Sequence, residues 1–127
     1  MSQQNLSGGG WVLLPQGAID TATSEQFQNR IQKFLEERTQ VPDLLLDLSG
    51  VKYLSSVGLG ALIQLLKKSR ETKSAFALYD PQLAVRRVLE ISKLDFLVVD
   101  PVSAAASGPF AEYIARKEAA RPPAKKI

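Results

Sequence analysis

The sequence predicts a single α/β domain, in which a small mixed β-sheet of about four or five strands has helices packed on it. Two observations favour this class. Short apolar runs that suit strands alternate with longer segments whose apolar residues recur at helical spacing. The 127 residues, of which 45% are hydrophobic and 23% are charged, are enough for one core. Because strands and helices alternate, we expect crossover connections between mostly parallel neighbours.

The composition divides the chain into three regions. Residues 1–10, MSQQNLSGGG, are poor in strand formers, and we predict a flexible N-terminus. Residues 11–100 hold the alternating elements and are predicted to form the domain. Residues 101–127 are predicted to be a linker of small residues up to Pro109, a weak helix around Phe110, Tyr113 and Ile114, and a basic disordered tail.

The first half of the domain is predicted to contain a strand, a helix and a second strand. Residues 11–14 are a short apolar run that ends in the turn sequence PQG. The helix begins at Thr23, with Gln26 in capping-box spacing. Its apolar residues follow with helical period at Phe27, Ile31, Phe34 and Leu35. Residues 43–48, DLLLDL, are nearly continuously apolar, as expected of a central strand buried on both faces.

The second half begins with a turn at residues 49–50 and a helix over about residues 57–72. The apolar residues of this helix are Leu59, Leu62, Ile63 and Leu66. Residues 75–79 alternate like a strand. Asp80 and Pro81 then predict the start of a third helix, as N-cap and first helical residue. Residues 95–99, DFLVV, are predicted to be the last strand.

The charge pattern argues against nucleic acid and membranes as partners. The net charge of +3 comes from residues 115–127, where five basic residues face one acidic residue and no aromatic side chain lies between the charges. We therefore predict no direct contact with nucleic acid. No stretch approaches the roughly 20 apolar residues that cross a bilayer, and residues 1–10 lack the features of a signal peptide. We expect a cytoplasmic protein without membrane insertion.

The chain has no histidine and no cysteine, which removes most catalytic chemistry. Zinc sites, thiolate nucleophiles and Ser-His-Asp triads all need one of these residues. The segment GLGALI lacks the third glycine of a dinucleotide site, and no P-loop ending is present. We therefore predict no enzyme, no metal and no cofactor. A small enzyme that uses Asp20 and Ser56 is the catalytic alternative, and the missing histidine disfavours it.

The segment LSSVGLGALIQLL, residues 54–66, places two serines and two glycines at a helix start. We expect it at the carboxyl end of the central strand, where the sites of open α/β sheets lie. On the residues alone, an ordinary serine N-cap is the favoured interpretation. Gly58 and Gly60 each cost roughly 0.5–1 kcal/mol relative to alanine, which close approach of a partner backbone or close packing on the sheet would explain. A phosphate on an exposed serine would suit the free amides of a helix N-terminus.

These residues resemble the STAS domain of anti-sigma factor antagonists. The resemblance covers roughly residues 11–100. It rests on DLSGVKYLSSVGLGALIQLL with the following DPQLAVRRVLEISKLD, and on GAID at residues 17–20, which is similar to an earlier loop of the family. Such proteins bind, when unphosphorylated, an anti-sigma factor that is also a serine kinase, and thereby free a sigma factor in bacterial transcription control. The kinase then phosphorylates the antagonist, and a serine phosphatase reverses this step.

The resemblance implies a site without catalytic residues. Ser56 falls at the position of the phosphorylated serine. Many phosphorylated members have aspartate before that serine and serine or threonine after it, where this chain has Ser55 and Val57, so Ser55 is an alternative acceptor. The implied partner-binding residues are Asp20, Thr21, Ser55, Ser56, Val57, Gly58, Leu59 and Gly60. The alternative function is a non-switching STAS scaffold, a subunit of a signalling or lipid-transport complex.

Overall fold

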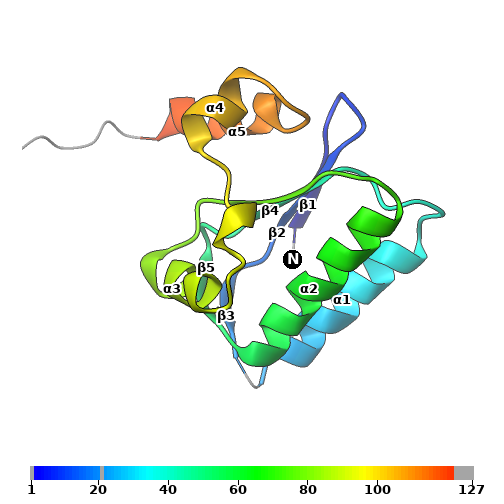
Figure 1. Cartoon of the computed structure of the whole chain (residues 1–127), viewed down its shortest axis with the longest axis vertical. Helices are drawn as coiled ribbons and strands as arrows, with labels where there is room; N and C mark the ends of the chain where they lie inside the picture. The colour runs from blue at the N-terminus through cyan, green and yellow to red at the C-terminus, as the bar shows by residue number, and fades with distance from the viewer. Residues whose placement is uncertain (1, 21, 122–127) are drawn as a thin grey trace, which may run out of the picture.

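The computed structural model describes residues 2–20 and 22–121, which form two sheets and the helices packed on them (Figure 1). The strands are β1 (Ser2–Asn5), β2 (Trp11–Leu14), β3 (Gly17–Ile19), β4 (Leu44–Asp47), β5 (Val51–Leu54) and β6 (Phe76–Tyr79). The α-helices are α1 (Ser24–Glu36), α2 (Ser56–Glu71), α3 (Leu83–Ile91), α4 (Pro101–Ala106) and α5 (Ala111–Ala120), and η1 (Asp95–Leu97) is a 3-10 helix.

The main sheet has the strand order β1-β2-β4-β6, and its last three strands are parallel. All four residues of β4 are buried, and β4 lies between β2 and β6. The predicted central strand is therefore confirmed: its continuous apolar run follows from burial on both faces. β3 and β5 form a separate parallel pair.

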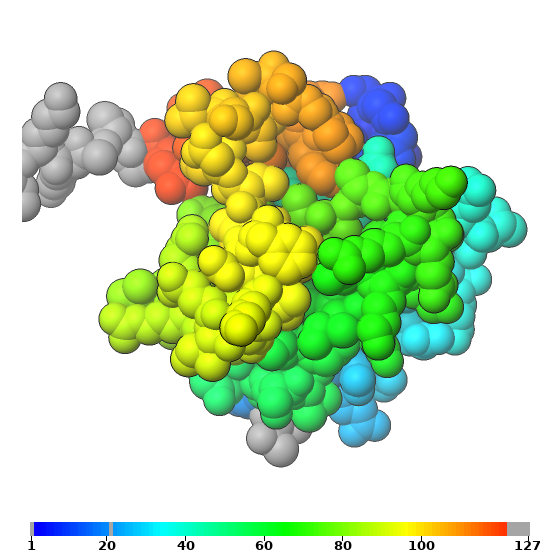
Figure 2. Space-filling model, in the orientation of Figure 1, coloured from blue at the N-terminus to red at the C-terminus, as the bar shows by residue number. Residues whose placement is uncertain are grey.

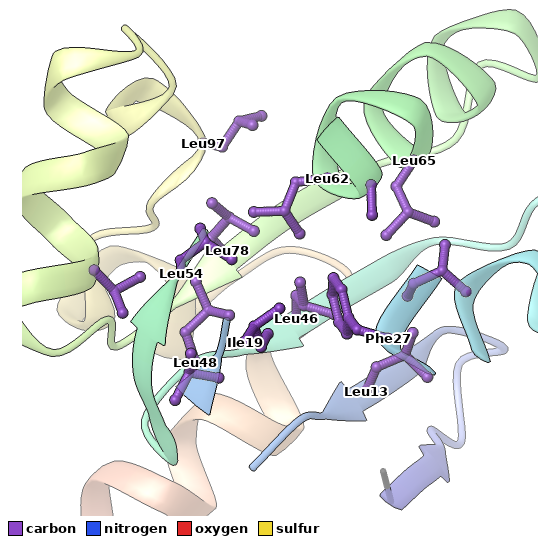
Figure 3. Close-up of a cluster of buried hydrophobic side chains, with 14 of the residues drawn as sticks. Leu13, Ile19, Phe27, Leu46, Leu48, Leu54, Leu62, Leu65, Leu78 and Leu97 are labelled. Carbon is purple, nitrogen blue, oxygen red and sulfur yellow. The ribbon is translucent and has the colours of Figure 1, made fainter. Parts of the chain in front are cut away.

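The main sheet has a hydrophobic core on each face. On one face, leucines of β2, β4 and β6 pack against α1 and α2, which lie side by side (Figures 1 and 3). The next residues along the same strands, among them Val12, Leu45 and Tyr79, point to the other face and pack against Phe110, Tyr113 and Ile114. In the space-filling view, α4 and α5 form a block in orange and red beside the blue N-terminal residues (Figure 2). The alternation of side chains along each strand builds both cores.

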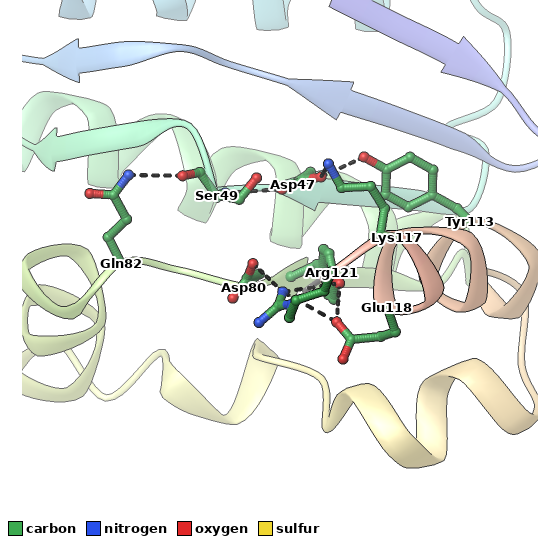
Figure 4. Close-up of polar contacts among 9 residues, drawn as sticks. Asp47, Ser49, Asp80, Gln82, Tyr113, Lys117, Glu118 and Arg121 are labelled. Carbon is green, nitrogen blue, oxygen red and sulfur yellow. Dashed lines mark hydrogen bonds and ion pairs between the residues drawn. The ribbon is translucent and has the colours of Figure 1, made fainter. Parts of the chain in front are cut away.

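The C-terminal helix α5 is also held by a buried carboxylate (Figure 4). The side chain of Asp47 is 0% exposed, and it accepts hydrogen bonds from the Tyr113 hydroxyl and from the backbone amide of Ser49. The Lys117 ammonium lies 3.7 Å from the same carboxylate. Burial, followed by the hydrogen bond to Asp47, raises the pKa of Tyr113. A buried carboxylate is tolerated because it is paired in this way.

A second set of contacts joins α5 to the end of β6 (Figure 4). The Tyr79 hydroxyl donates to the Glu118 carboxylate, and burial followed by this bond raises the pKa of Tyr79. The Arg121 guanidinium lies 2.6 Å from the Asp80 carboxylate and 3.2 Å from that of Glu118. The Asp80 charge is the main cause that raises the pKa of Arg121. Contacts to the ends of both β4 and β6 therefore fix the position of α5.

The N-terminal and C-terminal regions differ from the expectation. Residues 2–5, expected to be flexible, form β1, which pairs antiparallel with β2 from Ser2 opposite Leu14 to Asn5 opposite Trp11. Pairing with a buried strand, rather than propensity, makes this polar segment a strand. Residues 101–106, expected to be linker, form α4, with the Asp100 side chain as cap and Pro101 as first helical residue. The expected helix around Tyr113 and Ile114 is confirmed as α5, in which both side chains are buried.

Two boundaries in the second half of the domain were predicted wrongly. The third helix begins at Leu83 with Gln82 as N-cap, because Asp80 adopts a left-handed conformation with φ of 54° and pairs with Arg121. The expected strand over residues 95–99 is replaced by η1, whose N-cap Leu94 and last residue Leu97 are both buried at a spacing of three residues. A single parallel bridge between Val98 and Leu78 remains of it in the described structure.

Candidate functional site

The site forms where β3 and β5 end side by side. Ile19 pairs with Leu54 in this short sheet, and the Ser55 amide donates a 2.7 Å hydrogen bond to the Ile19 carbonyl. The loop that begins at Asp20 therefore lies beside the start of α2. The expected position at the end of the central strand β4 is wrong, since β5, a strand that the sequence analysis did not predict, carries the segment instead. The proximity of the two motifs agrees with the resemblance.

Ser55 is the N-cap of α2. Its backbone is extended, with φ of −78° and ψ of 168°, and its hydroxyl accepts a 3.1 Å hydrogen bond from the Gly58 amide. Its carbonyl accepts from the Leu59 amide at 2.9 Å. Ser55 is only 9% exposed. A phosphate here would displace a cap worth about 1 kcal/mol and would require burial of a dianion.

Ser56 is the first residue of α2, and its side chain is exposed. The first amides of a helix have no acceptor inside the helix. The amides of Gly58 and Leu59 donate to Ser55. The amides of Ser56 and Val57 come earlier in the chain and therefore have no acceptor inside α2. Val57 is 45% exposed beside them. The geometry thus presents one hydroxyl, two amides and a small apolar surface to a partner.

The two glycines of α2 have different surroundings. A Cβ atom on Gly58 would lie 2.7 Å from Ile19 Cγ2 and 2.8 Å from Leu54 Cδ1, well inside carbon contact distance. Gly58 therefore allows α2 to start close against the β3–β5 pair. A Cβ atom on Gly60 would meet nothing within 4 Å. Packing against the β3–β5 pair therefore explains why residue 58 is glycine. It does not explain Gly60, where a partner backbone could approach. Leu59, between the two glycines, is partly buried and packs against the core.

The carboxylate of Asp20 shapes the loop that leads into α1. Its Oδ1 atom accepts hydrogen bonds from the amides of Ala22 at 2.9 Å and Thr23 at 3.1 Å. The Thr23 hydroxyl bonds to the Ala18 carbonyl at 2.6 Å and accepts from the Asp20 amide at 3.0 Å. The expected capping box is therefore wrong: Thr23 occupies the N-cap position, and its side chain stabilises the loop instead. The predicted site residue Thr21 lies outside the described residues.

Tyr53 is a further exposed residue near the start of α2 that was not predicted. Tyr53 lies on β5 opposite Ala18 and is 50% exposed, two residues before the Ser55 cap. Exposed tyrosines are favoured where proteins bind one another. No pattern in the sequence pointed to this residue, because the strand that carries it was not predicted.

The described residues contain no group of three or more carboxylates that would hold a metal ion. No helix in residues 2–20 and 22–121 has the length and apolarity to cross a membrane. The start of α2 presents an exposed serine with exposed Tyr53 and Val57 close to it in the chain, which suits recognition by another protein.

Comparison with known proteins identifies relatives of the chain. The sequence pattern of the STAS domain matches residues 5–118. Among solved structures, the anti-sigma factor antagonist SpoIIAA in its unphosphorylated form is 17% identical, with a TM-score of 0.69 over 95% of this chain and 98% of that chain. The Bacillus cell fate determinant SpoIIAA in the phosphorylated form is 17% identical, with a TM-score of 0.64 over 91% and 97%. An anti-sigma factor antagonist from Mycobacterium paratuberculosis is 29% identical, with a TM-score of 0.64 over 75% and 78%.

Proposed function

The chain belongs to the STAS domain family, and on this premise we propose that it is an anti-sigma factor antagonist switched by phosphorylation of Ser56. Unphosphorylated, it binds an anti-sigma factor serine kinase in the cytoplasm and thereby frees a sigma factor. The kinase transfers a phosphoryl group to Ser56, which ends the interaction, and a serine phosphatase removes the group. The protein itself carries no catalytic residue in this scheme.

The difference between the two serines is the observation that carries the proposal. Ser56 is exposed at the open end of α2, whereas Ser55 is buried and bonded to Gly58. A kinase therefore reaches the Ser56 hydroxyl without unwinding the helix. The phosphate would lie near two free amides and the positive end of the helix dipole, so the helix itself tolerates the charge.

The same phosphate would act against a bound partner. It adds about −1.5 to −2 charges beside the exposed side chains of Tyr53 and Val57. A partner that buries this surface would have to desolvate the dianion, at a cost of several kcal/mol if it offers no cation. The Asp20 carboxylate in the neighbouring loop adds a negative charge at the same surface.

A phosphorylation assay with the anti-sigma factor kinase of the same organism tests the proposal. Purified protein, kinase and ATP are incubated, and the modified residue is located by mass spectrometry. We expect Ser56→Ala to abolish incorporation and Ser55→Ala to retain it. Phosphate on Ser55 contradicts the assignment of the acceptor to Ser56. Phosphate on neither serine contradicts the switch, and binding of the kinase without phosphorylation then favours the non-switching scaffold.

Titration calorimetry with the same kinase tests the consequence for binding. We expect Ser56→Asp to weaken binding at least about 30-fold, which corresponds to roughly 2 kcal/mol. Ser107→Asp is the matched control, because Ser107 is an exposed serine at the end of α4. Equal affinities of the two variants contradict the assignment of Ser56 to the interface.

A further inference from the structure

A groove runs along the outer side of α1, and three adjoining hollows that all include Arg30 form it. The first, of about 190 Å³, lies between α1 and residues 15–19 at the connection of β2 and β3. The second, of about 400 Å³, lies over Asn29 and Lys33. The third, of about 180 Å³, lies between Lys33 and Gln3 of β1. We call this surface, from Ala18 to Gln3, the α1 groove.

The α1 groove is cationic in its middle and apolar beneath. Arg30 and Lys33 are exposed and lie about one helical turn apart, so both charges face the same space. Phe27 and Phe34 are buried below them. In the described part of the chain, Glu37 at the far end is the one carboxylate that lines the hollows, and its oxygen lies 3.8 Å from the Arg38 guanidinium.

The far end of the groove meets the edge of the main sheet. β1 is the outermost strand, and within the described residues only β2 pairs with it. Edge strands are commonly protected by charges, proline or bulges, whereas β1 has the uncharged sequence SQQN and a regular register. Its backbone can therefore accept an extended segment from another chain.

We propose that the α1 groove binds an acidic, extended segment of the anti-sigma factor kinase that docks at Ser56. This rests on the proposed function. The first hollow includes Thr23, which holds the Asp20 loop, and Ile19, whose carbonyl accepts from the Ser55 amide, so the groove begins beside the residue that precedes Ser56. From Thr23 to Glu37 the helix rises about 20 Å, a distance that about six residues of extended chain span. A carboxylate on that segment would pair with the exposed Lys33 ammonium.

Zero-length carbodiimide cross-linking of the protein–kinase complex tests this contact directly. The reagent joins an ammonium to a carboxylate only where the two touch. We expect Lys33 to be linked to an Asp or Glu of the kinase, as located by mass spectrometry. Lys67 is the matched control, because it is also exposed but lies on α2, outside the groove. Links from Lys67 and none from Lys33 would overturn the proposal.

Binding measurements separate this proposal from the proposed function. Lys33→Glu is expected to weaken kinase binding about tenfold at low salt and by less at high salt, whereas Lys67→Glu stays within about twofold. Melting curves check that both variants fold. Suppose that the kinase binds and phosphorylates Ser56. If Lys33→Glu then has no effect on kinase affinity, or if both variants lose the same affinity, only the proposal for the α1 groove is refuted. If the wild-type protein fails to bind the kinase, both proposals fail.

Discussion

Alanine in place of Gly58 and of Gly60 should shift the stability of the protein in opposite directions. The two substitutions are chemically identical and lie two residues apart on α2. At Gly60 the added methyl group meets nothing within 4 Å, so helix propensity alone acts and stabilises by about 0.5–1 kcal/mol. At Gly58 the same gain is opposed by contacts of 2.7 Å and 2.8 Å with Ile19 and Leu54.

The cost at Gly58 follows from the size of the overlap. Carbon atoms prefer separations of about 3.5–4.0 Å, so each contact is short by roughly 1 Å. Ile19 is β-branched and buried, and Leu54 is buried, so neither side chain moves freely. Overpacking of this kind costs typically about 1–3 kcal/mol. After the propensity gain, we expect Gly58→Ala to destabilise by about 1–2 kcal/mol.

Urea denaturation monitored by the fluorescence of Trp11 measures both variants. The free energies of unfolding of Gly60→Ala and Gly58→Ala should differ by about 2 kcal/mol. If both variants are stabilised equally, the space between α2 and the β3–β5 pair accommodates a methyl group at residue 58, and our explanation of Gly58 is wrong. A loss of kinase binding by the stable Gly60→Ala variant would further support close approach of a partner backbone at that position.

Three further predictions concern the cap of α2 and the contacts of α5. Ser55→Ala should lower the free energy of unfolding by about 1 kcal/mol, whereas Ser107→Ala, at an exposed serine, should change it little in the same denaturation assay. Tyr113→Phe should cost about 1–3 kcal/mol by chemical denaturation, because the buried Asp47 carboxylate loses a donor, while Tyr53→Phe at an exposed position should change little. Because burial raises the pKa of Tyr79 and Tyr113 in the folded protein, the unfolded chain loses these protons first. The free energy of unfolding should thus fall as the pH rises above about 10, and the fall should be smaller in Tyr113→Phe.

The sequence predicted the elements that carry strong apolar patterns. β4 was found from its continuous run of leucines, and α2 from apolar residues at helical spacing. β1, β3 and β5 were missed, because each is three or four residues long and depends on pairing with a distant strand. The dipeptide Asp-Pro illustrates the same limit. At Asp100, where a linker was expected, it caps α4, whereas at Asp80, where a helix start was expected, a contact with Arg121 far along the chain holds a different backbone conformation.

The candidate site was predicted as a set of residues but not as an arrangement. The resemblance pointed to Ser56 as the acceptor, but the sequence could not say which of the two serines is the N-cap, because the hydrogen bond from the Ser55 amide to the distant Ile19 carbonyl helps to place the start of α2. It likewise treated Gly58 and Gly60 alike, since only the fold determines which of them faces Ile19. The sequence did not indicate the exposed position of Tyr53, because the strand that carries it was not predicted.

The contact between Asp47 and α5 also constrains how the chain folds during synthesis. Asp47 leaves the ribosome long before Tyr113 and Lys117, and until they follow, its carboxylate has neither partner. The second face of the sheet, with Val12 and Leu45, stays open over the same interval. The nascent chain can therefore assemble the core around α1 and α2 early, but it completes its second core only when nearly the whole described chain has emerged.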